Sequence, residues 1–446
     1  MWNPGKKALI ISSLMVAACG GDDNNNSTSS TTSPISCAGN VCTVKGELLE
    51  DTTFTADKEW VLSGGVFVGN DTDKTVLTIE PGTTVYGASG ALSFLTIRRG
   101  SQLNAQGTAD APIVFTSAQE KGSRARGDWG GLIINGRAPI NSCDTGVCEA
   151  EGEGGTGLYG GDDPTDSSGT LKYVRVEFAG ALITSDNELN GIAFQGVGSG
   201  TVIDYIQVHM NKDDGIEFFG GTAQAKHVVI TGAGDDSIDW TDGWQGKIQY
   251  AVVQQYADNG DNGIEADNNG DNNTASPRSN PTLANLTIVG VAGGEGSDIG
   301  VLLREGTSAH ISNAIVTGFN DGCLQIDGEE TFENAWTGSA LSGELEVSNT
   351  IVSCSTNFIE NTDDSFVAPF TVEDFFMSMN GNNVSADPML ENATPTEGAP
   401  NFAPKVGSPA IGAGLAPADS FFDTTDYIGA IGSTDWTTGW TIHDRN

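Results

Sequence analysis

"NGIAF", at residues 190–194, recurs three more times near the centre of the sequence, as "DGIEF" (214–218), "DSIDW" (236–240) and "NGIEA" (262–266). The second residues of these segments occupy positions 191, 215, 237 and 263. Self-similarity at a nearly constant period is typical of a solenoid, in which each repeat forms one coil that stacks on its neighbours. The motif therefore predicts a stack of short coils.

Hydrophobic and polar residues alternate within this motif. Side chains of a β-strand point to opposite faces in turn, so every second residue shares a face. One face is apolar and predicts ladders of core side chains, formed by Ile192, Ile216, Ile238 and Ile264 with Phe194, Phe218 and Trp240. We expect the other face, with Ala193, Glu217, Asp239 and Glu265, to lie outside the core.

The rest of each coil is also strand-like. A second apolar segment follows the motif, as in "KHVVITG" (226–232), and 60 glycines with abundant Asn and Asp supply the turns. In the N-terminal part, "LTIEPGTTV" (77–85) is followed by the similar "LTIRRGSQL" (95–103), which indicates a shorter repeat. No long apolar segment has the 3.6-residue period of a helix. We therefore predict an all-β fold, a single right-handed parallel β-helix with coils of about 18–26 residues.

The N-terminal segment has the features of a targeting signal. Lys6 and Lys7 precede a short apolar run, which is too short to span a membrane. The stretch "LMVAAC" (14–19) resembles a bacterial lipobox, which implies cleavage before Cys19 and lipidation of its thiol. An ordinary secretory signal is the alternative. Gly20 in place of Asp implies, by the same resemblance, the outer membrane or the cell surface.

These features divide the chain into three parts. We predict a signal peptide over residues 1–18, a flexible polar tether over 19–36 and the β-helix domain over 37–446. The domain is expected to be a monomer that touches the membrane only through its lipid anchor.

The charge balance restricts the possible partners. The chain has 59 acidic and 20 basic residues, a formal charge of −39. Such a charge disfavours nucleic acid and anionic lipid as direct partners, and leaves divalent cations, glycans and other proteins. Solubility in salty water is the alternative reason for the charge.

Six cysteines follow Cys19 and form three pairs along the chain. Cys37 with Cys42 and Cys143 with Cys148 share a spacing that suits a small loop closed by a disulfide in an oxidising compartment. We predict both disulfides, and a third between Cys323 and Cys354. Zinc binding is poorly supported, because the chain has only four histidines and they are scattered.

Longer stretches of the sequence resemble a known superfamily. The succession "LTIEPGTTV", "LTIRRGSQLNAQGTADAPIVFTS" and "WGGLIINGRAPI" (129–140), with "GSPAIGAG" (407–414) near the end, resembles bacterial parallel β-helix repeat proteins of the pectin-lyase-like superfamily. The terminal "DWTTGWT" (435–441) is similar to surface-lipoprotein members of undefined role. The resemblance implies the fold but not an activity, because this architecture hosts lyases, hydrolases, adhesins and spacers.

Acidic residues concentrate at corresponding positions of the central coils. Asp236 shares a column with Asn190, Asp214, Asn262 and Asp321, where Asn and Asp suit the turn before each strand. Two further columns bring carboxylates to the strand spacing of about 4.8 Å, where like charges repel. Calcium suits such columns, and its predicted ligands are Asp213, Asp235, Asp239, Asp261, Glu217 and Glu265. Solvated surface acids are the alternative.

Catalysis is the competing interpretation of these acids. "GDDSI" (234–238) resembles the Asp-Asp segment of polygalacturonases, which would make Asp235 and Asp236 the acid pair. The other segments of that family are not found at the neighbouring coils, and the only candidates for the cationic base of a lyase are Lys212 and Arg304. We therefore expect a non-catalytic protein that binds a glycan or a surface protein, with Trp244 contacting the ligand. A polysaccharide-degrading enzyme and a structural or adhesive spacer are the alternatives.

Overall fold

The computed structural model describes residues 33–446, apart from residues 91, 144, 185–186, 339, 364, 379–381, 396–397 and 416. The predicted signal peptide, Cys19 and residues 19–32 of the predicted tether lie outside the described residues. Residues Pro34–Asn446 form one compact unit. Within the described part of the chain, no helix is long and apolar enough to span a membrane.

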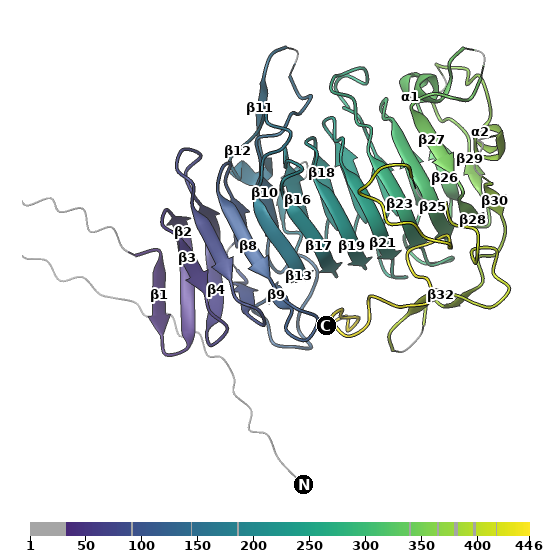
Figure 1. Ribbon diagram of the computed structural model, residues 1–446. Coiled ribbons are helices and arrows are strands. Elements are labelled where there is room, and N and C mark those ends of the chain that lie inside the picture. The colour runs from purple at the N-terminus through teal and green to yellow at the C-terminus, as the bar shows by residue number, and fades with distance from the viewer. Residues whose placement is uncertain are drawn as a thin grey trace, which may run out of the picture. The chain divides into compact units, whose positions relative to one another are not determined.

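Parallel strands stack coil upon coil through this unit (Figure 1). Its main sheet has 26 strands, and all its pairs are parallel except that of β1 (Ile35–Ala38) with β2 (Val41–Leu48). Only two α-helices occur in the described residues, α1 (Glu329–Ala335) and α2 (Val372–Ser378). The prediction of a single right-handed parallel β-helix is confirmed.

The recurring motif lies on one ladder of strands, the motif sheet. Ile192, Ile216, Ile238 and Ile264 pair in register and are buried, as the alternation predicts. The ladder continues in both directions, so that the motif strands are its middle part. Its strands are β4 (Glu59–Val68), β7 (Phe94–Ile97), β10 (Gly131–Asn135), β16 (Ile192–Gln195), β18 (Ile216–Phe219), β20 (Ile238–Thr241), β22 (Ile264–Ala266), β24 (Ile299–Leu303), β26 (Gly322–Ile326) and β29 (Phe358–Ile359).

The glycine of the motif is fixed by the close approach of neighbouring coils. A Cβ atom on Gly215 would lie 2.5 Å from the carbonyl oxygen of Ser237, and one on Gly191 would lie 2.6 Å from that of Gly215. No real Cβ contact is that short, so a side chain here would push the coils apart.

A second ladder consists of long strands that bend in the middle. Each bends at a residue with left-handed backbone, including Tyr205 (φ 54°), His227 (φ 53°) and Asn285 (φ 58°). These bent strands are β13 (Gly169–Glu177), β17 (Val202–His209), β19 (Gln224–Thr231), β21 (Lys247–Gln254), β23 (Thr282–Val289) and β25 (Ala309–Thr317). In the flanking coils each half is a separate strand, namely β3 (Thr52–Phe54), β5 (Val76–Ile79), β6 (Thr84–Gly87), β8 (Gln102–Gln106), β9 (Ile113–Ser117), β27 (Leu345–Ser348), β28 (Ile351–Ser353) and β30 (Val384–Ser385).

Coil lengths differ from the prediction in two places. Leu77 pairs with Leu103, whereas Leu95 pairs with Val66, so the recurrence of "LTI" joins strands of different ladders rather than successive coils. Leu132 pairs with Ile192, much further along the chain, because two hairpins are inserted between them.

One column of the predicted alignment is shifted at its end. The prediction that Asp321 continues the column of Asn262 is wrong. Val301 pairs with Ile264 on one side and with Leu324 on the other. Counting back two residues from each, the column of Asn262 continues with Ile299 and Gly322. Asp321 lies one column earlier, where its backbone N–H donates to the carbonyl of Asp298. The irregular loop before β24 hides this shift from the repeat pattern.

The inserted hairpins pack on the outward face of the motif sheet, where Tyr159 and Leu189 join one hydrophobic cluster with Ile133 and Ala193. The first hairpin pairs β11 (Cys148–Glu151) with β12 (Leu158–Gly161) around the 3-10 turn η1 (Glu153–Gly155), and the second pairs β14 (Leu182–Thr184) with β15 (Asn187–Glu188). We call them the roof hairpins. Near the C-terminus, β31 (Leu390–Asn392) pairs with β32 (Asn401–Pro404).

All three predicted disulfides are present. The S–S distances are 2.00 Å for Cys37–Cys42, 2.08 Å for Cys143–Cys148 and 2.00 Å for Cys323–Cys354. The third joins the motif sheet at β26 to the turn after β28 and closes a much longer loop than the other two.

Candidate functional site

The outward row of the motif sheet is acidic in three consecutive coils. Glu217, Asp239 and Glu265 pair in register on β18, β20 and β22, as predicted. The turns before these strands carry further acids, and the roof hairpins bring Glu153 and Glu188 to the same place. As a result, Glu217 is only 8% exposed although it points away from the core.

Two of the turn acids hold neighbouring coils together. The Asp214 Oδ1 atom accepts the backbone N–H of Asp236 at 2.9 Å, and the Asp236 Oδ1 atom accepts that of Asn262 at 2.6 Å. The predicted architectural role of this column is therefore visible, but the acceptor serves the next coil rather than its own turn. This arrangement explains why a short acceptor side chain recurs here.

The same acids approach each other closely. Carboxylate oxygens of Asp214, Glu217 and Asp239 lie within 4.8 Å of one another, and so do those of Asp214, Asp235 and Asp236. A third group with the same spacing links the second roof hairpin to the turns of the motif sheet. Its members are Glu188, Asp213 and Asp235. We call the residues of these three groups the carboxylate cluster: Glu188, Asp213, Asp214, Glu217, Asp235, Asp236 and Asp239.

The electrostatics of the cluster are unfavourable if all its groups are ionised. Burial, followed by the charge of Asp239, raises the pKa of both Asp214 and Glu217 well above the ordinary range. Burial and the nearby Glu188 raise the pKa of Asp213 to about 8. Without a bound cation, several of these groups would therefore carry protons at neutral pH.

Within the part of the chain that the structure describes, some buried oxygen atoms at and beside the cluster have no hydrogen-bond partner. Among the described residues, the Oδ1 atoms of Asn190, Asp239 and Asn262 are buried and have no hydrogen-bond partner. Asn190 is 1% exposed, and its Nδ2 atom donates to Glu217, which places its amide at the cluster. Buried oxygens normally find a partner, so these atoms fit the coordination of a cation.

One basic residue lies at the edge of this acidic region. Arg304 follows β24, and its guanidinium binds Glu265 at 2.8 Å and Asp267 at 2.9 Å. The carboxylates of both partners keep the pKa of Arg304 above its usual value despite the desolvation by burial. Glu265 is thereby paired with a protein cation and belongs to none of the three close groups, although its charge still raises the pKa of Asp239, after burial.

The predicted calcium ligands divide accordingly. Asp213, Asp235, Glu217 and Asp239 belong to the cluster, whereas Glu265 pairs with Arg304. Asp261 lies at the next turn, where burial and Asp235 raise its pKa to about 6.

Three members of the cluster, Glu188, Asp214 and Asp236, are absent from the predicted calcium ligands. Asp236 is predicted only as a turn residue or as part of a catalytic acid pair. The column alignment assigns Asp214 to turn geometry alone, although its carboxylate also faces Glu217 and Asp239. Glu188 lies on a hairpin that is not part of the repeat, so no periodic signal could have found it.

Two other predicted site residues lie elsewhere. Trp244 is 0% exposed and stacks on Phe218 with ring centroids 4.0 Å apart, so the prediction that it contacts a ligand is wrong. The chain turns back into the core after β20, which the local sequence does not show. Lys212 is exposed and its side chain lies beside Gly127.

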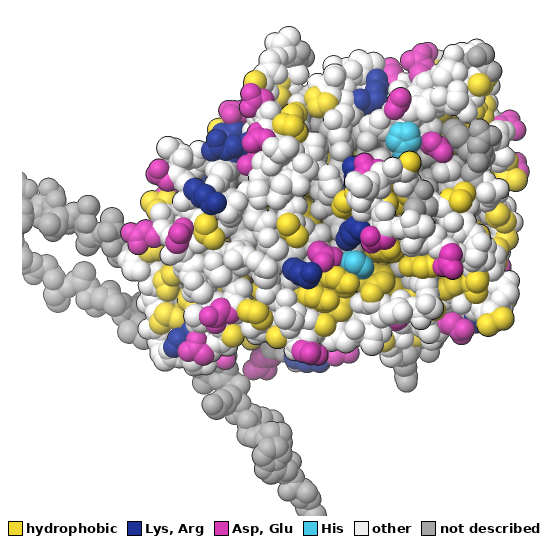
Figure 2. Space-filling model, in the orientation of Figure 1, with side chains coloured by type: hydrophobic (Ala, Val, Ile, Leu, Met, Phe, Trp, Pro, Cys, Tyr) yellow, Lys and Arg dark blue, Asp and Glu magenta, His cyan; other side chains and the backbone are white. Residues whose placement is uncertain are grey.

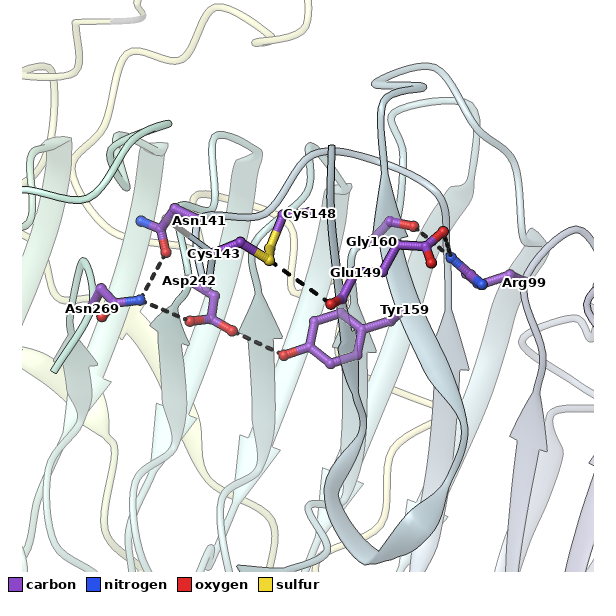
Figure 3. Close-up of a disulfide and its surroundings, with 9 residues drawn as sticks. All are labelled: Arg99, Asn141, Cys143, Cys148, Glu149, Tyr159, Gly160, Asp242 and Asn269. Carbon is purple, nitrogen blue, oxygen red and sulfur yellow. Dashed lines mark hydrogen bonds and ion pairs between the residues drawn. A yellow bond between two sulfur atoms is a disulfide. The ribbon is translucent and has the colours of Figure 1, made fainter. Parts of the chain in front are cut away.

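A polar groove of about 750 Å³ lies beside the first roof hairpin. Figure 3 shows part of its lining, including Asn141, Tyr159, Asp242 and Asn269, and the Cys143–Cys148 disulfide beside them. The Tyr159 hydroxyl donates to Asp242 Oδ2 at 2.9 Å, and Asn269 Nδ2 donates to Asn141 Oδ1 at 3.1 Å. The groove therefore presents amide and carboxylate groups that are held in fixed positions.

The stacked parallel coils define the class of protein, a parallel β-helix, and the acidic cluster lies on the outward face of one of its sheets. A family model described as a pectate-lyase-like beta helix domain matches residues 46–441, and the chain belongs to this family. No curated protein matches the chain.

Proposed function

We propose that the protein is a lipid-anchored protein of the outer membrane or cell surface, whose calcium-loaded β-helix binds a glycan or a partner protein without cleaving it. The observation that carries the proposal is the carboxylate cluster with its buried, unpartnered oxygens at Asn190, Asp239 and Asn262. At neutral pH these carboxylates must either carry protons or share a bound cation, and a cation lets all of them ionise.

Calcium fits the donor set better than other common cations. It accepts six to eight oxygen ligands in flexible geometry, and the cluster offers only carboxylate and amide oxygens. Asp214, Glu217 and Asp239 would hold an ion against the sheet, with Asn190 as a neutral ligand. Glu188, Asp213 and Asp235 would hold the second roof hairpin through the same kind of contact.

Geometry argues against catalysis by the candidate residues. Arg304 is held by two carboxylates that raise its pKa, so it is not available as a base. Carboxylate oxygens of Asp235 and Asp236 lie within 4.8 Å, whereas an inverting hydrolase separates its two carboxyl groups by roughly 6.5–9.5 Å. Asp236 is also committed to the backbone of Asn262.

The polar groove supplies the binding face in this proposal. Asn141 and Asn269 are only 3% and 7% exposed and hold the wall of the groove through hydrogen bonds. The exposed Asp271 and Asn272, whose backbone N–H groups donate to Asn269, would contact the ligand. Side chains of this kind bind the hydroxyl groups of sugars or the polar rim of a protein surface.

Calorimetric titration of the protein with calcium, after treatment with EDTA, tests the cation site. We expect saturable binding that magnesium does not reproduce, and at least a tenfold weaker affinity in Asp239→Asn. Asp321→Asn, which changes an exposed acid in the turn before β26, is the matched control and should bind like the parent protein. Equal affinity in both variants would contradict the assignment.

A glycan array with and without calcium, together with a reducing-sugar assay, tests the function itself. We expect binding without release of reducing ends. Robust turnover of an acidic polysaccharide would overturn the non-catalytic assignment in favour of an enzyme, and absence of any glycan binding would leave a protein partner or a spacer.

A further inference from the structure

The C-terminal segment runs back along the β-helix, against the direction in which the coils follow one another. Figure 1 shows this yellow segment crossing the bent strands and ending near β9 and β13. We call residues 419–445 the strap. Its contacts extend from Lys247, which pairs with Asp419, to Lys121, which pairs with Asp444.

Side-chain amides on the coils bind the backbone of the strap rather than its side chains. Gln207 accepts the N–H of Ile442 at 2.8 Å and donates to its carbonyl at 2.7 Å. Gln249 does the same at Asp423, with distances of 2.8 and 2.9 Å. An amide that satisfies both backbone groups of one residue recognises an extended chain independently of its sequence.

Other bent strands add contacts between these two points. Asn285 donates to the carbonyls of Tyr427 and Gly429, and Thr287 accepts the N–H of Ala430. Arg175 donates to the carbonyl of Trp440. The backbone N–H of Gly429 also donates to the Asn313 carbonyl on β25, and Lys226 on β19 pairs with Asp423. The strap is therefore bonded to all six bent strands, β13, β17, β19, β21, β23 and β25.

Aromatic packing fixes the register of the strap. Trp436 lies edge-on to His227 at 5.0 Å, and Trp440 lies edge-on to Tyr173 at 5.7 Å. Hydrophobic side chains gather on this face where the strap crosses the coils (Figure 2). The last residues close the contact, because Arg445 stacks on the Tyr256 ring at 3.8 Å and His209 bonds the Asp444 carbonyl at 2.8 Å.

This arrangement changes how a solenoid unfolds. Each coil of a solenoid contacts only its neighbours, so its ends can fray coil by coil. A strap bonded to six neighbouring bent strands binds fully only when all of them are formed and aligned. We propose that the strap is a clamp that makes these coils open as one cooperative unit.

Proline substitutions in the strap test the clamp without changing the coils. Ile442→Pro and Asp423→Pro each remove an N–H group that an amide binds, whereas Ile442→Ala and Asp423→Ala keep it. We expect the double proline variant to show at least tenfold faster amide exchange in the strap and in β13 to β25, and a broader urea transition. The double alanine variant, the matched control, should unfold nearly as sharply as the parent protein.

Two results would overturn the proposal. One is a double proline variant whose transition has the parent midpoint and slope. The other is fast exchange of the strap amides in the parent protein. Calcium affinity is measured in the same variants and should be unchanged, because no cluster residue bonds the strap among the described residues, so the clamp and the cation site can fail separately.

Discussion

The Asp236 carboxylate holds the next coil and belongs to the carboxylate cluster at the same time. Its Oδ1 atom accepts the N–H of Asn262, and its oxygens lie near those of Asp214 and Asp235. An acceptor is needed at this position, whereas a negative charge is not needed for the hydrogen bond.

Substitutions at Asp236 separate the two roles. Asp236→Ala leaves the buried N–H of Asn262 without a partner, and we expect it to lower the free energy of unfolding by ~1–3 kcal/mol. Asp236→Asn keeps an oxygen acceptor and removes one charge, so it should be at least as stable as the parent protein in EDTA. Urea unfolding measures both, and equal losses in the two variants would contradict the role of the hydrogen bond.

Trp244 is a core residue, and its substitution should show this. Trp244→Ala removes a fully buried ring that stacks on Phe218, and we expect a loss of ~3–5 kcal/mol in the free energy of unfolding. Trp244→Phe should lose less, because it keeps the stacked ring. A variant with parent stability and weaker ligand binding would instead restore a role in recognition.

At the scale of the element, the motif sheet makes stability depend on pH. The pKa values of Asp261, Glu265 and Asp213 are raised to about 6, 7 and 8, mainly by burial. The folded protein therefore binds more protons than the unfolded chain between about pH 4 and pH 8. This contribution is fully present below the unfolded pKa values and is lost as the pH rises through the folded ones.

We therefore expect the free energy of unfolding in EDTA to fall as the pH is raised from 5 to 8. Calcium favours the ionised carboxylates, so it should flatten this decline, and a site of roughly 10 µM affinity would add about 2.7 kcal/mol at millimolar calcium. Urea unfolding at each pH, at fixed ionic strength, checks both statements. A stability that rises over this range in EDTA would contradict the raised pKa values.

At the scale of the whole molecule, the prediction of a lipid anchor can be tested without structural data. We expect Cys19→Ala to move the protein from the membrane fraction to the soluble fraction, because the anchor depends on that thiol. The double variant Cys37→Ala and Cys42→Ala removes a disulfide of the folded domain and is the control, which should stay with the membrane. Retention of Cys19→Ala in the membrane would contradict the lipobox interpretation.

The sequence by itself determined the fold and the outward acidic row. The motif recurs at a nearly constant period, and apolar and polar residues alternate strictly at Ile216, Glu217 and Phe218. Only one register between neighbouring strands buries all the apolar residues, so the strand register followed from the local pattern. The disulfide partners followed from the number of cysteines and from their spacing along the chain.

Only the tertiary structure decided which acids form the site. Glu188 reaches the cluster from an inserted hairpin, and Glu265 pairs with Arg304 instead of joining the cluster. The strap brings Arg445 to Tyr256, which is far away in the sequence. These contacts join repeat strands to segments that lie outside the repeat. A repeat pattern predicts only how each coil pairs with the next one, so it could not predict these contacts. Burial by the roof hairpins, which turns a row of surface acids into groups with raised pKa values, is likewise a property of the folded chain alone.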